Sequence, residues 1–248
     1  MIHQLENKRV LVTGGSRGIG AAIVRRLARE GADVAFTYVS KPDQAEDTVK
    51  AAQAFGVKAL AIQADSADAG AVVAAVERTV RELGGIDILV NNAGIGIIAP
   101  IDDYRLEDFD RTLAVNVRAV FVATQAAVKH MQAGGRIINI GSCNAERVPF
   151  AGAGVYAMSK AALVGLVKGL ARDLGPRGIT INNVHPGPVD TDMNPASSDF
   201  AKLTVERFVA IPRYSSADEI ASLVAWLAGP ESAYVTGASL SIDGGYAA

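Results

Sequence analysis

Tyr156 and Lys160 stand four residues apart in the run YAMSK, where a helical pattern of apolar residues begins. On a helix this spacing places both side chains on one face, so an ammonium group would lie beside a phenol. A tyrosine with an ordinary pKa of about 10 is a poor acid or base at neutral pH, and a neighbouring cation lowers that pKa. The pair therefore predicts proton transfer at an oxygen atom. The alternative is that Tyr156 is a core aromatic with a polar tip.

Other polar residues end apolar runs. Ser142 follows RIINI, and Asn91, Asn92, Ala93 and Gly94 end the apolar run before it. Both places are carboxyl ends of predicted strands, the edge where α/β proteins bind ligands. Ser142 could also simply cap its strand.

A metal centre is not predicted. Cys143 is the only cysteine, which excludes an internal disulfide and a cysteine-rich metal site, and we interpret it as a small buried residue. His3, His130 and His185 show no metal-ligand spacing, so we interpret them as non-catalytic.

The run TGGSRGIG lies where the first predicted strand turns into the first predicted helix, and its glycines fall at positions 14, 15, 18 and 20. Glycines allow a pyrophosphate to approach the backbone, and the N–H groups of a helix N-terminus bind anions. The spacing differs from the common dinucleotide fingerprint GxGxxG. A tight turn with close helix packing is the alternative. The residues predicted to contact a dinucleotide here are Gly14, Ser16, Arg17, Gly18, Ile19 and Gly20.

The end of the second predicted strand favours NADP over NAD. A carboxylate normally stands there to bind the ribose 2′-hydroxyl of NAD, whereas this chain has Tyr38, Val39, Ser40 and Lys41. Arg17, Ser40 and Lys41 offer donors suited to a 2′-phosphate. The alternative is a solvated lysine and a surface arginine.

The elements that must position these residues alternate along the chain. Short β-branched runs cover residues 9–14, 33–39, 58–64, 86–94, 135–142 and 178–187, separated by longer helical patterns, which predicts an α/β fold with a mainly parallel sheet and helices on both faces. A seventh strand, ASLSIDGG, follows a helix over 217–228 and closes one sheet edge. The stretch 192–211 breaks the alternation and is predicted to be a mobile substrate lid.

Length and composition are those of one globular domain over residues 1–248. Lys and Arg number 24 against 26 Asp and Glu, without a basic stripe, which argues against nucleic acid. The first residues lack an apolar signal core, and no run of 18 uncharged apolar residues follows, so a cytoplasmic location is expected.

Together, TGGSRGIG, NNAG, LAVNV, Ser142, YAMSK and HPGPVDT occur in the order and positions seen in short-chain dehydrogenases/reductases, and the chain resembles that family over nearly its whole length. The resemblance implies a Rossmann-type doubly wound fold with seven strands, a homotetramer, and a catalytic tetrad of Asn116, Ser142, Tyr156 and Lys160. Ser142 would donate to the substrate oxygen, and Asn116 would hold a water that reprotonates Lys160. In the same way it implies further cofactor contacts at Asp65, Ser66, Asn92, Ala93, Gly94, Pro186, Gly187, Val189 and Thr191.

Within the family the chain looks most like 3-oxoacyl-thioester reductases and NADPH carbonyl reductases. This favours an NADPH-dependent reduction of a ketone or 3-oxoacyl carbonyl, with a mainly apolar pocket built from loops at 95–98, 144–153 and 192–211. The run GPRGITINNVHPGPVDTDMNP also resembles a cyclic-dinucleotide-binding member, so a nucleotide-binding regulator that retains the fold is the alternative.

Overall fold

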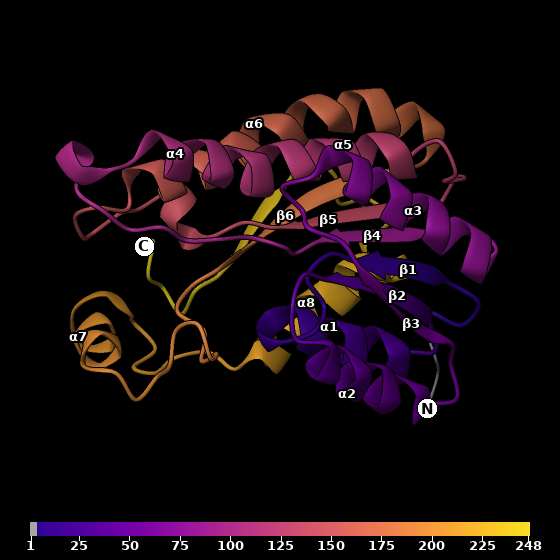
Figure 1. The fold of residues 1–248 in the computed structure, drawn as a ribbon, viewed down its shortest axis with the longest axis horizontal. Coiled ribbons are helices and arrows are strands. Elements are labelled where there is room, and N and C mark those ends of the chain that lie inside the picture. Colours follow the sequence, from indigo (N-terminus) through magenta and orange to yellow (C-terminus); the bar gives the residue numbers. More distant parts are fainter. Residues whose placement is uncertain (1–3) are drawn as a thin grey trace.

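The computed structural model describes residues 4–248, and its centre is a seven-stranded parallel sheet (Figure 1). The strand order is β3-β2-β1-β4-β5-β6-β7, and every neighbouring pair is parallel. The strands are β1 (Arg9–Val12), β2 (Asp33–Tyr38), β3 (Ala59–Gln63), β4 (Ile88–Asn91), β5 (Arg136–Ile140), β6 (Thr180–Pro186) and β7 (Ser239–Ile242). The predicted α/β fold and the edge position of the seventh strand are confirmed.

Helices cover both faces of the sheet because its strands are apolar on both sides. On β1, Val10 and Val12 join the core cluster that contains α1, α2 and α8, whereas Leu11 joins the cluster on the opposite face with α3, α5 and α6 (Figure 1). The helices of the first layer are α1 (Gly18–Arg29), α2 (Pro42–Gln53) and α8 (Ala217–Ala228). Those of the second layer are α3 (Ala69–Leu83), α4 (Leu106–Leu113), α5 (Ala119–Ala127) and α6 (Gly154–Leu174).

The chain reverses its direction across the sheet between β1 and β4. From β1 the chain builds β2 and β3 on one side, and it then returns to place β4 on the other side of β1. Loops leaving the carboxyl ends of these two strands diverge, which opens the crevice where open α/β sheets bind ligands. The glycine-rich turn follows β1, and the run NNAG spans the end of β4.

The stretch 192–211 contains a helix that the sequence did not predict, α7 (Asp199–Phe208). The Ser198 hydroxyl caps it by accepting from the Ala201 N–H at 3.1 Å. The helix stands apart from both layers, near the C-terminus (Figure 1). It is anchored by edge-to-face contacts of Phe200 with Phe150, 5.5 Å between ring centroids, and of Phe208 with Tyr246, 6.2 Å.

One helix of the described residues, spanning Gly154–Arg177, is long and apolar enough to cross a membrane. It comprises α6 and its 3₁₀ continuation, and it packs against β6 within the second helix layer. Its Leu163, Val167 and Leu174 are buried, so we interpret it as a helix of the second layer that packs on the sheet along one side.

Candidate active site

The glycine-rich turn serves both packing and ligand approach, at different glycines. A Cβ at Gly20 would lie 2.0 Å from the Gly14 carbonyl oxygen, and one at Gly15 would lie 2.5 Å from Cβ of Phe36, so these two positions are required for packing. Gly14 and Gly18 have φ of 68° and 52°, in the left-handed region, and both line a cavity at the carboxyl ends of the strands. The packing interpretation therefore holds for Gly15 and Gly20, and the approach of a ligand to this turn stays a prediction.

The N-terminus of α1 is free to bind an anion. Arg17 is its extended N-cap and makes no side-chain cap hydrogen bond, and the first turn contains no acidic residue. The first N–H groups of a helix lack partners within the helix, and they carry the positive end of its dipole. The turn, with its bare helix N-terminus, thus fits a pyrophosphate.

Asn92 fixes the turn to the end of β4. Its Nδ2 donates to the carbonyl oxygens of Thr13 and Gly14, each at 2.9 Å. In return the Thr13 hydroxyl accepts from the N–H groups of Asn92 and Ala93, each at 3.0 Å. The NNAG run therefore holds the shape of the turn as well as lining the cavity.

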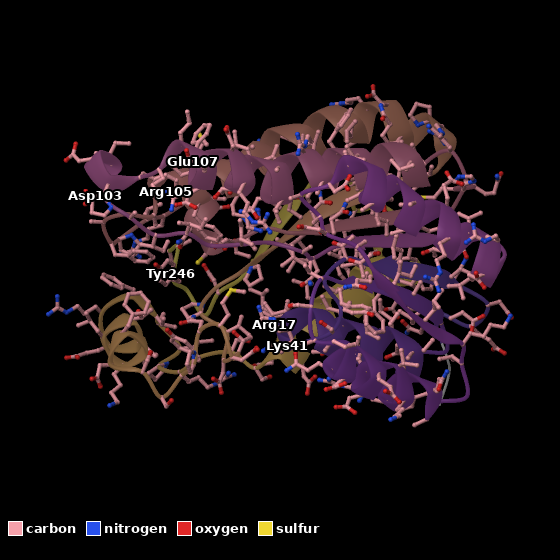
Figure 2. The ribbon with its side chains drawn as sticks, viewed as in Figure 1. Arg17, Lys41, Asp103, Arg105, Glu107 and Tyr246 are labelled. Atoms are coloured by element: carbon pink, nitrogen blue, oxygen red, sulfur yellow. The ribbon has the colours of Figure 1, made fainter. Side chains whose placement is uncertain are left out.

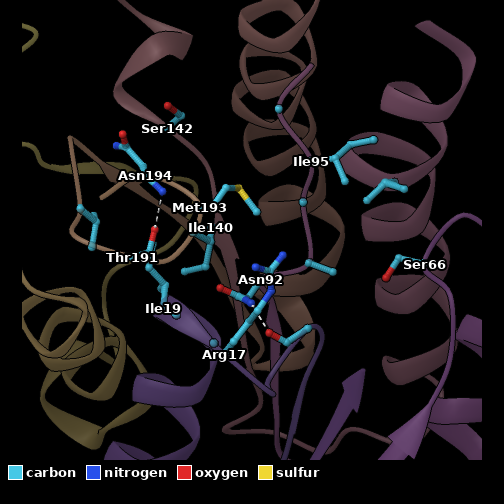
Figure 3. Close-up of a pocket in the computed structure, with 18 of the residues that line it drawn as sticks. Arg17, Ile19, Ser66, Asn92, Ile95, Ile140, Ser142, Thr191, Met193 and Asn194 are labelled. Atoms are coloured by element: carbon cyan, nitrogen blue, oxygen red, sulfur yellow. Dashed lines mark hydrogen bonds between the residues drawn. The ribbon is translucent and has the colours of Figure 1, made fainter. Parts of the chain in front are cut away.

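The turn and the strand ends surround a cavity of about 410 Å³ (Figure 3). Of the residues predicted to bind a cofactor or react, all but Lys41 and Asn116 line it. Residues that line it without having been predicted as site residues include Val39, Ile95, Gly96, Arg111, Val115, Ile140, Gly141, Asp192, Met193 and Asn194. Lys41 is exposed at the N-terminus of α2 with φ 65°, close to the cavity end formed by Tyr38 and Ser40.

The predicted adenine end carries an ion pair. Asp65 accepts from the Ala67 N–H at 2.9 Å through Oδ1, while its Oδ2 lies 3.5 Å from Nη2 of Arg111. Arg111 comes from α4, far along the chain, and no motif singled it out. Ser66 is buried beside Asp65 in the same wall (Figure 3).

At the other end of the cavity, Ser142, Tyr156 and Lys160 come together from the end of β5 and the first turns of α6. Ser142 hydrogen-bonds to Tyr156. Lys160 is buried, its Nζ donates to the Ile140 carbonyl oxygen at 2.9 Å, and Nζ lies 5.8 Å from the Tyr156 ring centroid. The spacing of four residues on a helix thus places Lys160 beside Tyr156, as predicted.

Asn116 lies behind this group in a π-helical turn, Ala114–Arg118, between α4 and α5. Its Oδ1 accepts from the Ile95 N–H and its Nδ2 donates to the Ile95 oxygen, both at 2.9 Å, while Nδ2 also donates to the Ser159 hydroxyl at 3.0 Å. Asn116 therefore ties the loop after β4 to α6. A Cβ at Gly94 would lie 3.2 Å from Lys160 Nζ and 3.5 Å from Asn116 Oδ1, so a glycine there keeps the two side chains close.

The charges of the pair differ from the sequence-based expectation in one respect. Burial lowers the pKa of Lys160 to about 8. Burial also raises the pKa of Tyr156, and the hydrogen bond with Ser142 only partly opposes this. The prediction that Lys160 lowers the pKa of Tyr156 is wrong for the protein without a bound nicotinamide, because desolvation of the phenolate dominates and Nζ of Lys160 donates to the Ile140 oxygen instead.

Behind Ser142, His185 packs against Gly141. A Cβ at Gly141 would lie 2.4 Å from Cδ2 of His185, and the imidazole is fully buried with no hydrogen-bond partner on either ring nitrogen among the described residues. Burial lowers its pKa, so the ring is neutral, although Glu146 Oε1 lies 3.7 Å from Nδ1. His185 does not line the cavity.

Cys143 is buried, as expected, and burial raises the pKa of its thiol to about 12. His130 pairs with Glu77 on the surface at 2.9 Å. His3 lies outside the described residues. Across residues 4–248, no group of three or more His, Cys, Asp or Glu side chains could hold a metal ion.

Comparison with known proteins agrees with this geometry. A family model described as enoyl-(acyl carrier protein) reductase matches residues 14–247. A cyclic-di-GMP-binding biofilm dispersal mediator protein of Escherichia coli (strain K12) is 49% identical over 241 residues, which cover 97% of this chain and 98% of that protein. The chain belongs to the short-chain dehydrogenase/reductase family. The resemblance seen in the sequence is thereby confirmed.

Other short-chain dehydrogenases/reductases connect the fold with reduction and with NADP. A 3-oxoacyl-(acyl-carrier-protein) reductase of Staphylococcus aureus (strain N315) is 39% identical over 240 residues, 96% of this chain and 97% of that protein. A short-chain dehydrogenase from Burkholderia cenocepacia J2315, crystallised with NADP, is 57% identical, with a TM-score of 0.97 and coverage of 99% of this chain and 100% of that chain.

Proposed function

We propose that this protein is an NADPH-dependent reductase that converts a ketone or 3-oxoacyl carbonyl to the alcohol, reversibly, with Tyr156 as the general acid. One observation carries the proposal: Ser142, Tyr156 and Lys160 gather at one end of a cavity whose other end is the bare N-terminus of α1. A protein that only bound nucleotides would not need a phenol, a hydroxyl and a buried ammonium at the place where a carbonyl would lie.

NADPH, when bound, supplies the hydride that adds to the carbonyl carbon. As the C–O π bond breaks, the oxygen gains negative charge, and the Ser142 hydroxyl donates a hydrogen bond to it. Tyr156 gives its Oη proton to that oxygen, which completes the alcohol and leaves a phenolate. The ammonium of Lys160 stabilises the phenolate and then gives it a proton, which restores the Tyr156 hydroxyl. Asn116 keeps one Oδ1 lone pair for a water that reprotonates Lys160.

The raised pKa of Tyr156 suits its proposed role as the general acid of reduction. A general acid must be protonated before the reaction, and burial keeps the phenol protonated at neutral pH. Alcohol oxidation needs the phenolate, which burial disfavours. Lys160, whose pKa is lowered to about 8, is charged at neutral pH and loses its charge above it.

In the proposed complex the pyrophosphate of NADPH would lie against the segment from Gly14 to Gly20. Ser40, Lys41 and Arg17 would hold the 2′-phosphate, and Asp65 with Ser66 would hold the adenine. The nicotinamide end would lie against Pro186, Gly187, Val189 and Thr191, which line the cavity next to Lys160.

We propose a neutral, largely apolar substrate, since Ile95, Val115, Ile140 and Met193 line the cavity. In the neighbouring loops, Ile98 lies against Gly152 and Phe150 packs on Phe200. In the loop 144–153, Arg147 donates through Nη1 to the main-chain oxygens of Tyr246 and Ala248, at 2.7 and 3.1 Å. Nη1 of Arg147 is thus already used within the protein, which makes this residue less suited to bind a free carboxylate of a substrate. The segment 192–211 would cover this end as a lid.

The test is a panel of carbonyl substrates assayed by NADPH absorbance with the unmutated protein, Tyr156→Phe and Lys160→Ala. Tyr156→Phe removes only the hydroxyl, and we expect kcat to fall by about 10² to 10⁴ with little change in NADPH affinity. Lys160→Ala should lower both kcat and the affinity for NADPH. The double variant should lose no more than the worse single one, because the residues act as one proton-transfer unit.

A second candidate is a regulator that binds a cyclic dinucleotide, which the 49% identity with the biofilm dispersal mediator protein favours. Titration with cyclic-di-GMP separates the two. If no carbonyl on the panel is reduced, while cyclic-di-GMP binds at micromolar concentration and Tyr156→Phe leaves that binding intact, the reductase proposal is wrong.

We also propose a cytoplasmic homotetramer, from resemblance to the family.

A further inference from the structure

Asp192 is the first residue of the segment 192–211, and its carboxylate reaches the glycine-rich turn. Its Oδ2 lies 2.8 Å from Nη1 of Arg17, and both side chains are about half exposed, 48% and 46%. Both residues line the cavity (Figure 3 labels Arg17 beside the turn). This is the only ion pair in the described part of the chain that links residues 192–211 to another segment.

The carboxylate occupies surroundings that favour a phosphate. Asp192 Oδ1 lies 3.9 Å from where a Cβ of Gly18 would be, next to the bare N-terminus of α1. Arg17 lowers the pKa of Asp192 through their hydrogen bond, and Lys41 adds to this through its charge. Figure 2 labels Arg17 and Lys41 next to each other, and both cations act on Asp192. They are the two cations assigned above to the 2′-phosphate.

The turn that carries Asp192 has a defined shape. Thr191 and Asn194 exchange backbone hydrogen bonds at 3.4 and 3.1 Å, and the Thr191 hydroxyl also accepts from the Asn194 N–H at 3.2 Å (Figure 3). Asp190 Oδ1 accepts from the Ala196 N–H at 2.9 Å. The position of the carboxylate is thus set by its own turn, and the contact with Arg17 fastens this turn to the other wall of the cavity.

We propose that Asp192 is an internal competitor of the cofactor 2′-phosphate for Arg17, so that only a phosphorylated cofactor releases the segment 192–211 from the turn. A phosphate carries more charge than a carboxylate and takes an arginine with paired hydrogen bonds. NADH has no 2′-phosphate and leaves the pair intact. Asp192 thereby lowers the affinity for NADPH while coupling the choice of cofactor to the lid. The inference rests on the proposed use of NADPH.

The first experiment measures binding of NADPH and of NADH by nicotinamide fluorescence in the unmutated protein and in Asp192→Asn. Exposed ion pairs are weak, so we expect Asp192→Asn to bind NADPH about two- to fivefold more tightly, with a smaller change for NADH. In the Arg17→Ala background the same substitution should have no selective effect on NADPH. The matched control is Asp199→Asn, which removes an equal charge from the same segment but pairs only with Lys202.

An unchanged or weaker NADPH affinity of Asp192→Asn, or equal tightening for both cofactors, would overturn the inference. The result for the unmutated protein tests the proposed function separately. If that protein binds NADPH and NADH equally, the proposed cofactor is wrong. If it prefers NADPH and Asp192→Asn changes nothing, only the role of Asp192 is wrong.

The second experiment follows amide hydrogen exchange of residues 191–196 without substrate. We expect Asp192→Asn to exchange faster than the unmutated protein in the absence of cofactor, while Asp199→Asn does not. NADPH should change exchange of this segment in the unmutated protein and NADH should not. The same exchange in Asp192→Asn and in the unmutated protein would mean that the ion pair does not fasten the segment.

Discussion

Lys160→Met should make the cofactor-free protein more stable at neutral pH, by an amount that disappears as the pH rises. Burial lowers the pKa of Lys160 from 10.5 to about 8 in the folded protein, so the folded state disfavours the ammonium. At 1.36 kcal/mol per pKa unit, this costs about 3 kcal/mol at pH 7. Methionine fills similar volume without the charge. It loses the hydrogen bond of Nζ to Ile140, which is worth about 1 kcal/mol at any pH.

The direction in which stability changes with pH follows from how many protons the folded and unfolded states bind. Between pH 8 and 10.5 the unfolded chain holds a proton on Lys160 that the folded protein has released, so the unmutated protein gains stability as the pH rises through this window. Below pH 8 the folded protein bears the full cost of burying the charged ammonium of Lys160. The advantage of Lys160→Met should therefore be about 2 kcal/mol near pH 7 and should fall to about zero near pH 9.5.

Urea unfolding at several pH values measures both proteins, and Lys168→Met is the control. Lys168 is exposed on the same helix, so its replacement removes an equal charge from the surface and leaves the buried site of Lys160 intact. The difference in unfolding free energy between a variant and the unmutated protein removes the contribution of other groups that titrate in this pH range. A difference between Lys160→Met and the unmutated protein that stays constant from pH 7 to 9.5 would refute the assigned pKa. Lys160→Met should also be inactive, so here function is retained at the expense of stability.

Three further results are expected. Gly20→Ala should destabilise the protein by about 1 to 3 kcal/mol, seen as a lower Tm, because its Cβ would lie 2.0 Å from a carbonyl oxygen, whereas Gly154→Ala, with open space around it, should leave Tm unchanged. Arg17→Ala should reduce the NADPH over NADH preference in kcat/KM about tenfold, and equal efficiency of both cofactors before mutation would contradict the assignment. Light scattering should report a tetramer at micromolar concentration, and a monomer would rule this out.

Local patterns in the sequence were sufficient for the sheet and for most of the cavity. The β-branched runs gave the strands, and the glycine turn, NNAG, Ser142 and YAMSK lie where strand ends or a helix start must place them. These are local signals, because strand ends of a parallel sheet share one edge whatever the loops do.

Contacts between distant segments could not be predicted in the same way. Arg111 meets Asp65, and Asp192 meets Arg17, across separations that no spacing rule covers. The helix α7 was missed because the Pro and Ser residues before it obscured its pattern. The direction of the Tyr156 pKa was wrong because desolvation depends on the whole fold, whereas the spacing to Lys160 reports only one neighbour.

The fit of His185 against Gly141 restricts the order in which these two positions can change during evolution. Any residue larger than glycine at 141 would place its Cβ 2.4 Å from the imidazole, so His185 must first give way to a smaller side chain. That first step leaves a void beneath the loop of Ser142, which costs stability until position 141 grows to fill it. The two positions are therefore expected to vary together among related sequences, although neither side chain takes part in the reaction.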